Sequence, residues 1–162
     1  MKEQAMSKNT AIEKLKSGSV GIGVLCIIAA LFNLMIILAN SIRGGLFTSN
    51  VFTLERYAAI RQLISSGILT VIMILAALMF FRIFKDGIPF TAKNFRTVRI
   101  IGILFLVNAV IPSVCAAGLL GTFSGIGGIV NPSALVEGLL FLFIAHMVRY
   151  GAMLQQESDE TL

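Results

Sequence analysis

The feature that most constrains this chain is a set of four long runs of apolar residues. The runs lie at about 20–42, 63–84, 98–120 and 129–150. A helix needs about 20 predominantly apolar residues to cross a hydrocarbon core that is roughly 30 Å thick. The first run contains no charged residue, whereas the fourth is interrupted by Pro132, Glu137 and His146. The sequence therefore predicts four membrane-spanning segments.

Composition favours the same class of protein. Hydrophobic residues make up 57% of the 162 residues and charged residues only 13%, whereas soluble domains contain about 25% charged residues. Strands are excluded because the runs lack period-2 alternation and an open sheet in lipid would leave backbone groups without hydrogen bonds. The first run is also longer than the apolar core of a cleavable signal peptide. We therefore predict an all-α fold, an integral membrane bundle of four transmembrane helices that forms a single membrane domain over 1–162.

The distribution of positive charge predicts an orientation, because Lys and Arg near span ends remain in the cytoplasm. With four spans, the N-terminal segment 1–19, the loop 85–97 and the tail 151–162 share one side. That side carries ten of the 13 basic residues, namely Lys2, Lys8, Lys14, Lys16, Arg82, Lys85, Lys93, Arg96, Arg99 and Arg149, and the other side carries Arg43, Arg56 and Arg61. We expect both termini to be cytoplasmic.

The loop between the second and third runs contains several local signals. Gly87 and Pro89 are expected to end the second helix, and Thr91 is a candidate N-cap for the third. Three basic residues then follow at three-residue spacing, namely Lys93, Arg96 and Arg99. Two interpretations stay open: this stripe contacts anionic lipid headgroups as part of the topology signal, or it docks a cytoplasmic protein.

Three polar residues lie inside the predicted spans. Glu137 is the carboxylate of the fourth span, and a charge at the centre of a membrane helix is costly. Counting the helical rise places Asn33 at a similar depth and Asn108 within about one turn of it. We therefore predict an intramembrane polar cluster of Asn33, Asn108 and Glu137, which either holds the helices together or carries a proton or an ion.

A stripe of small residues follows one face of the third span. Ser113, Ala117 and Gly121 recur every four residues and would let another helix approach closely. The partner helix would belong either to the same chain or to a second copy in a homo-oligomer.

The motifs of common enzymes are missing. The sequence contains no H-E-x-x-H, P-loop or G-x-S-x-G motif, and Cys26 and Cys115 are too far apart to form a clustered metal site. We expect that the protein is not an enzyme and that it has no catalytic residues, cofactor or metal.

Two segments resemble a known family. The first is Gly87-Ile88-Pro89-Phe90-Thr91-Ala92-Lys93-Asn94, followed by Arg96, Arg99 and Ile101-Gly102, and the second is Arg149-Tyr150-Gly151 with Leu154-Gln155, Glu157, Asp159 and Thr161. Together with the four spans, they resemble the YoaS-like family of four-helix bacterial membrane proteins, which is defined by a domain of unknown function. Glu160 departs from the pattern, because the family has an apolar residue there. The resemblance implies a location in the bacterial inner membrane and a gene beside that of a small helix-turn-helix regulator.

The charge count and the resemblance together suggest a function. Both family segments are predicted to face the cytoplasm, so we expect a regulatory protein of the lipid bilayer that binds a small helix-turn-helix DNA-binding protein and does not itself bind nucleic acid. The candidate partner-binding residues are Gly87, Pro89, Phe90, Thr91, Asn94, Arg96, Arg99 and Gln155. One alternative is a small oligomeric transporter or channel that uses Glu137. Another is an immunity-type membrane protein that acts through the external loop at 44–57.

Overall fold

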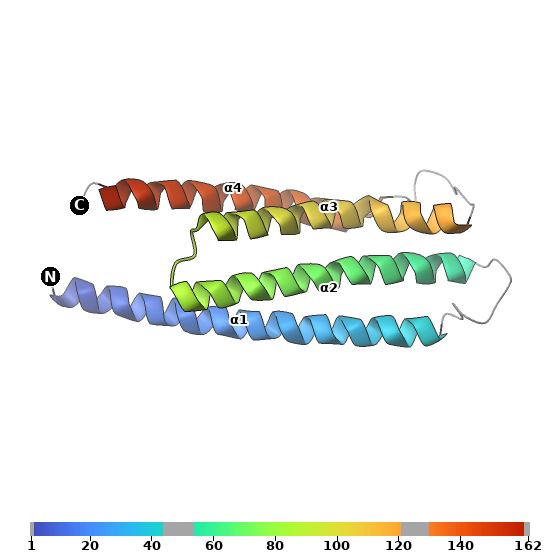
Figure 1. Ribbon diagram of the computed structural model, residues 1–162, viewed down its shortest axis with the longest axis horizontal. Coiled ribbons are helices and arrows are strands. Elements are labelled where there is room, and N and C mark those ends of the chain that lie inside the picture. The colour runs from blue at the N-terminus through green and yellow to red at the C-terminus, as the bar shows by residue number, and fades with distance from the viewer. Residues whose placement is uncertain (1, 44–53, 121–129, 161–162) are drawn as a thin grey trace.

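The fold is all-α, as the apolar runs predict. The computed structural model describes residues 2–43, 54–120 and 130–160. Over these residues it contains α1 (Lys2–Arg43), α2 (Leu54–Asp86), α3 (Ala92–Leu120) and α4 (Pro132–Glu160) (Figure 1). Each helix contains a stretch that is long and apolar enough to cross a membrane. The chain is therefore a multi-pass integral membrane protein.

The helices extend beyond the apolar runs. α1 begins at Lys2 and has 42 residues, which corresponds to a length of about 63 Å, roughly twice the hydrocarbon thickness. The segment 2–19 thus continues the first span as a helix. α4 likewise continues to Glu160, so most of the predicted tail is helical.

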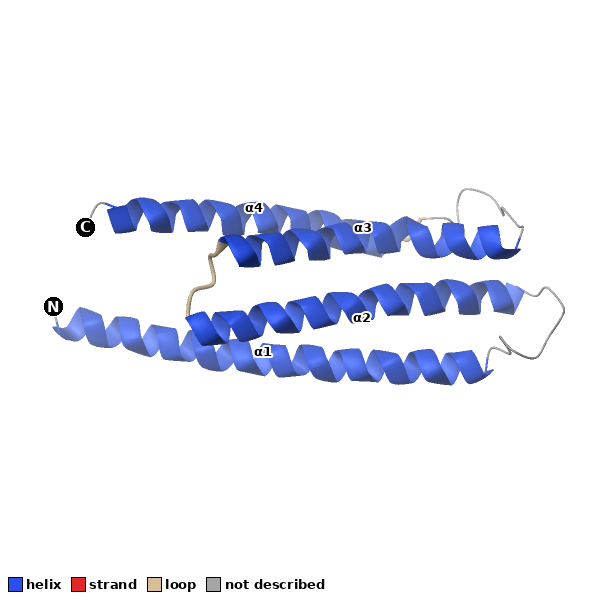
Figure 2. Cartoon of the chain, viewed as in Figure 1, coloured by secondary structure: helices blue, strands red, loops and turns tan. Residues whose placement is uncertain are grey.

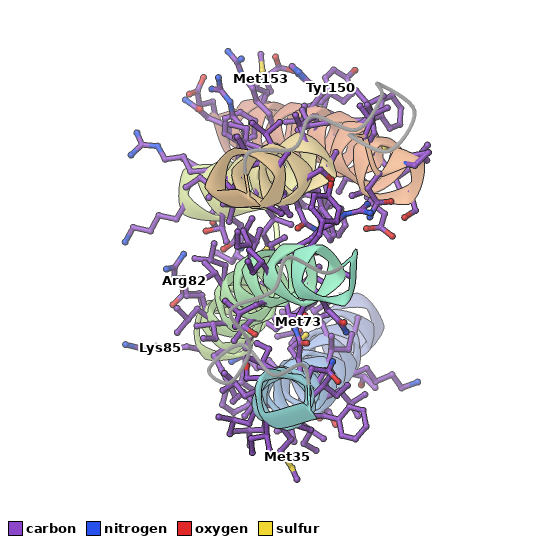
Figure 3. All side chains as sticks on the ribbon, turned by 90° about the vertical axis from the view of Figure 1, so that its right-hand side faces the viewer. Met35, Met73, Arg82, Lys85, Tyr150 and Met153 are labelled. Atoms are coloured by element: carbon purple, nitrogen blue, oxygen red, sulfur yellow. The ribbon has the colours of Figure 1, made fainter. Side chains whose placement is uncertain are left out.

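The four helices lie side by side in chain order. α1 packs against α2, α2 against α3 and α3 against α4, and the cartoon shows the short connection between α2 and α3 as a loop (Figure 2). Seen along the helices, α1 and α4 occupy opposite edges of the row, where Met35 and Met153 point outward (Figure 3). α3 is the most enclosed helix. Half of its most apolar stretch is buried within the chain, compared with 11% of the corresponding stretch of α1. The arrangement is an open row of helices in which α3 is the most buried.

The connection between α2 and α3 is shorter than the predicted loop 85–97, because both helices are capped inside it. Gly87 has a φ of 68° and its N–H donates to the carbonyl oxygen of Ile83 at 2.8 Å. This is a left-handed helix end, a conformation that glycine adopts without a Cβ clash. At the start of α3, the Thr91 hydroxyl accepts the N–H of Asn94 at 3.2 Å. Thr91 is therefore the N-cap, as predicted.

α3 and α4 are joined both by glycines and by a backbone hydrogen bond. A Cβ at Gly102 would lie 3.1 Å from the carbonyl oxygen of Gly138, and a Cβ at Gly138 would lie 3.0 Å from that of Gly102. Near the other end of the pair, the N–H of Asn131 donates to the carbonyl oxygen of Ala109 at 2.8 Å, close to Pro112 inside α3. Because only small residues permit such proximity in membrane helices, Gly102 and Gly138 set the spacing of this pair.

The apolar core lies between α2, α3 and α4. Ile72 of α2 packs with Ile101 and Phe105 of α3, all of them buried. The ring of Phe105 stacks on that of Phe141 in α4, with the ring centroids 5.3 Å apart. The small side chains of the predicted stripe are also covered, since Ser113 and Ala117 are buried within the chain. Gly121 lies outside the described residues.

Candidate functional site at the basic end

One end of the molecule gathers the segments that carry most of the positive charge. α1 begins, α2 connects to α3 and α4 finishes at this end, and the opposite end holds the other ends of the four helices (Figure 1). We call it the basic end, because ten of the 13 Lys and Arg residues belong to the segments that meet there. The helices thus bring together the three regions that the charge count places on one side.

The two segments of the family resemblance touch at the basic end. Phe90, in the α2–α3 connection, packs on Gly151 of α4, and a Cβ at Gly151 would lie 2.9 Å from the nearest ring carbon of Phe90. Gly87 contacts a third element, since a Cβ there would lie 3.1 Å from Cε of Lys16 in α1. The connection is therefore held between α1 and α4.

Asn94 supports the connection from within. Its side chain is 3% exposed, and its Nδ2 donates to the carbonyl oxygen of Pro89 at 2.9 Å. Its Oδ1 is buried without a hydrogen bond. Of the candidate partner-binding residues, Asn94 is thus placed to shape the turn, and its amide is not on the surface.

Other candidates do lie on the surface. Phe90 is 43% exposed, and the side chains of Arg96 and Arg99 are also exposed. Pro89 and Thr91 are partly buried. Arg82 of α2 donates a hydrogen bond to the Thr97 hydroxyl of α3 at 3.1 Å, which links the two helices near the basic residues. Arg96 and Arg99 remain available to bind a negatively charged or polar group.

The last turns of α4 add an apolar surface beside these charges. Met153 and Leu154 are exposed, and Tyr150 and Met153 point away from the other helices (Figure 3). Met153 lines a shallow groove of about 210 Å³ with Gln156, Glu157 and Glu160. Gln155 belongs to the same helix. The basic end therefore presents cationic, apolar and acidic side chains within a few turns of one another.

A second hollow lies between α3 and α4 near the same end. It has a volume of about 410 Å³ and is lined by Phe95, Arg99, Leu142, Ala145, His146 and Arg149. The guanidinium of Arg149 lies 6.0 Å from the centroid of the Phe95 ring, a distance at which cation–π attraction is significant. We call this hollow the α3–α4 basic pocket. Sequence reasoning missed it, because its cationic residues come from two helices whose relative rotation the sequence does not define.

The three residues of the predicted intramembrane cluster have different partners and burial in the described part of the chain. Asn33 Nδ2 donates to the carbonyl oxygen of Ser66 at 3.1 Å and to the Thr70 hydroxyl at 3.4 Å, which joins α1 to α2. Asn108 is buried in α3 with its Oδ1 unpaired. Glu137 is exposed on α4. The amide of Asn33 thus finds its partners on α2, and no hydrogen bond joins the three residues in the described regions.

A further cavity marks the opposite end of the molecule. It has a volume of about 400 Å³ and is lined by Tyr57, Ala58, Arg61, Gln62, Ser65 and Asn131. Part of the external loop considered for an immunity-type function, 44–53, lies outside the described residues. Among the described residues that line this cavity, Arg61 is the cationic one and none is acidic.

The described part of the chain offers no group of three or more His, Cys, Asp or Glu side chains that could hold a metal. Cys26 and Cys115 are free thiols. No protein-family model, curated protein or solved structure significantly matches this chain. The candidate site must therefore be interpreted from its own residues.

Proposed function

We propose that this chain is a regulatory protein of the bacterial inner membrane that binds a small helix-turn-helix DNA-binding protein at its basic end, in the cytoplasm. The observation that carries the proposal is the contact of Phe90 with Gly151, which unites the α2–α3 connection and the last turns of α4 in one surface. The resemblance to the YoaS-like family supplies the class of partner, and the excess of positive charge supplies the orientation.

The chemistry of this surface suits a protein partner. Arg96 of α3 provides an exposed guanidinium at this end, and Met153 and Leu154 in the last turns of α4 provide exposed apolar area. Interfaces combine a desolvated apolar centre with a polar rim, and both Arg and Met are enriched in them. Asn94 is buried, so we assign it to the shape of the connection and assign direct contact to Arg96, Phe90 and the last turns of α4.

The test is a pair of substitutions that change the surface without changing the fold. Arg96→Glu reverses the charge of one exposed side chain, and Met153→Glu replaces the apolar surface of another with a carboxylate. We expect the regulator to move from the membrane to the soluble fraction and its target genes to change expression. The matched control is Ala58→Glu, which places the same charge on an exposed residue at the opposite end. An exposed residue in the middle of a span, such as Met35, would not serve as a control, because a glutamate there would disrupt the span. The proposal fails if the regulator's location and target expression are the same in all variants.

A second candidate function, an oligomeric transporter or channel, rests on Glu137. Its carboxylate is exposed on the edge helix α4, within a stretch apolar enough to span the membrane. An exposed carboxylate in lipid is costly, and a second copy packed on α4 would enclose it. Glu137→Gln tests this candidate, because a proton-coupled activity requires the carboxylate and would be lost, whereas a regulator would retain its function.

A further inference from the structure

We propose that the α3–α4 basic pocket binds the phosphodiester headgroup of an anionic phospholipid. The proposal does not rest on the regulatory function, because all the lining residues belong to one pair of helices of this chain. Its residues come from the first turns of α3 and the later turns of α4, namely Phe95, Arg99, Leu142, Ala145, His146 and Arg149.

The pocket exists because α3 and α4 are held together on both sides of it. Toward the centre of the membrane span, the backbones meet at Gly102, where a Cβ would lie 3.0 Å from the N atom of Leu142. Toward the basic end, Phe90 packs on Gly151. Between these two contacts the small side chain of Ala145 leaves room, and the hollow of about 410 Å³ forms there.

The chemistry of the lining selects an anion. Two guanidinium groups and an imidazole line the pocket, and none of the lining residues that the structure describes is acidic. Arg99 and Arg149 approach from different helices, so a ligand between them accepts hydrogen bonds from both. A planar guanidinium binds the oxygens of a phosphate or a carboxylate in a bidentate manner, which favours an oxyanion over a halide.

The surroundings select a lipid as the source of the phosphate. Phe95, Leu142 and Ala145 make the rest of the lining apolar. Exposed apolar side chains continue from the pocket along both helices at helical spacing, namely Ile103 one turn after Arg99 and Phe143 about one turn before His146. Acyl chains attached to the bound headgroup would lie on these side chains.

The depth of the pocket fits a headgroup. Arg99 lies seven residues after the start of α3 at Ala92, which is about 10 Å along the helix. Basic pockets between membrane helices at this level bind anionic headgroups, and long Arg side chains reach the interface from such positions. A soluble phosphate compound would not use the apolar walls.

The experiment measures lipid binding to the purified full-length chain by native mass spectrometry in a mild detergent. Dioleoyl phosphatidylglycerol and dioleoyl phosphatidylcholine, which share their acyl chains, are titrated separately. We expect phosphatidylglycerol to bind at least about tenfold more tightly. Millimolar inorganic phosphate should leave the bound phosphatidylglycerol in place.

Variants locate the site. Arg99→Gln removes one of the two guanidinium groups of the pocket. Arg99 makes no hydrogen bond within the described residues, so the substitution should not disturb the fold. We expect phosphatidylglycerol to bind about tenfold more weakly. Arg149→Gln should have the same effect from the opposite helix. Arg96→Gln removes an exposed arginine of α3 that does not line the pocket, and it should change binding less than about twofold. Circular dichroism verifies that all three variants retain the helical fold.

Three outcomes would overturn the proposal. Equal binding of the two lipids would show that the headgroup charge is not recognised. An equal loss in the Arg96 and Arg99 variants would show diffuse attraction to a basic surface. Displacement of phosphatidylglycerol by inorganic phosphate would identify a soluble phosphate as the ligand and would contradict the assignment to a lipid.

Discussion

Gly102 of α3 and Gly138 of α4 face each other across the helix pair, and a Cβ on either one would lie within 3.1 Å of the other's carbonyl oxygen. The neighbouring leucines complete a reciprocal contact. Leu106, one turn after Gly102, covers Gly138, and Leu142, one turn after Gly138, covers Gly102. This contact fixes the separation of α3 and α4, and therefore the width of the pocket between them.

Gly138→Ala should weaken this helix pair. The added methyl group would lie 2.7 Å from Cδ2 of Leu106 and 3.0 Å from a backbone oxygen that cannot move alone. Overpacking of this kind costs about 1–3 kcal/mol. Thermal unfolding in detergent, followed by circular dichroism, measures the change. The control is Gly118→Ala on α3, which meets nothing within 4 Å; equal melting of the two variants would contradict the account.

Asn33→Ala should loosen α1 from α2. The substitution removes the hydrogen bonds to the Ser66 carbonyl and the Thr70 hydroxyl, and such bonds between membrane helices contribute about 0.6 kcal/mol on average and up to about 1.7. Asn40→Ala is the matched control, because Asn40 lies on the same helix and makes no hydrogen bond within the described residues. The assignment is wrong if the control variant unfolds at the same temperature as Asn33→Ala.

Gly87→Ala should destabilise the connection at the basic end. The φ of 68° at Gly87 costs an L-residue with a Cβ roughly 1–2 kcal/mol. Gly87→Asn should cost less, because Asn tolerates this conformation. Gly67→Ala in α2, where a Cβ meets nothing within 4 Å, should be neutral or stabilising. Unfolding in denaturant measures all three, and a neutral Gly87→Ala would show that the turn is not held in this form.

The orientation can be tested with single cysteines in a chain whose Cys26 and Cys115 are replaced by Ser. We expect Lys93→Cys, at the basic end, to react with a membrane-impermeant maleimide only after the cells are opened. Ala58→Cys, at the opposite end, should react in intact cells. Both side chains are exposed, so burial does not explain a difference. If Lys93→Cys reacts in intact cells and Ala58→Cys does not, the protein has the opposite orientation and the prediction is wrong.

Length and composition predicted much of the fold. The four helices follow from the apolar runs, since no other backbone structure satisfies its own hydrogen bonds over such lengths in lipid. The N-cap at Thr91 followed from local chemistry. The extent of α1 was not predicted, because residues 2–19 are mostly polar and contain no long apolar run to mark them as part of the helix.

The site was harder to predict, because helical rise gives the depth of a side chain but not its direction. Asn33, Asn108 and Glu137 were placed at similar depths, yet they face different surroundings. Neither Gly102 nor Gly138 belongs to a G-x-x-x-G motif, so that motif did not mark them as a contact. The burial of Asn94 likewise depends on how the turn closes over it.

The most direct test of the regulatory function is photo-crosslinking in cells from probes at Arg96 and Met153, with a probe at Ala58 as the control. All three side chains are exposed, so each probe reaches its surroundings. We predict that the two probes at the basic end capture a small helix-turn-helix DNA-binding protein and that the control does not. Capture of the same protein from Ala58, or of none from Arg96 and Met153 when the regulator is present, would contradict the account.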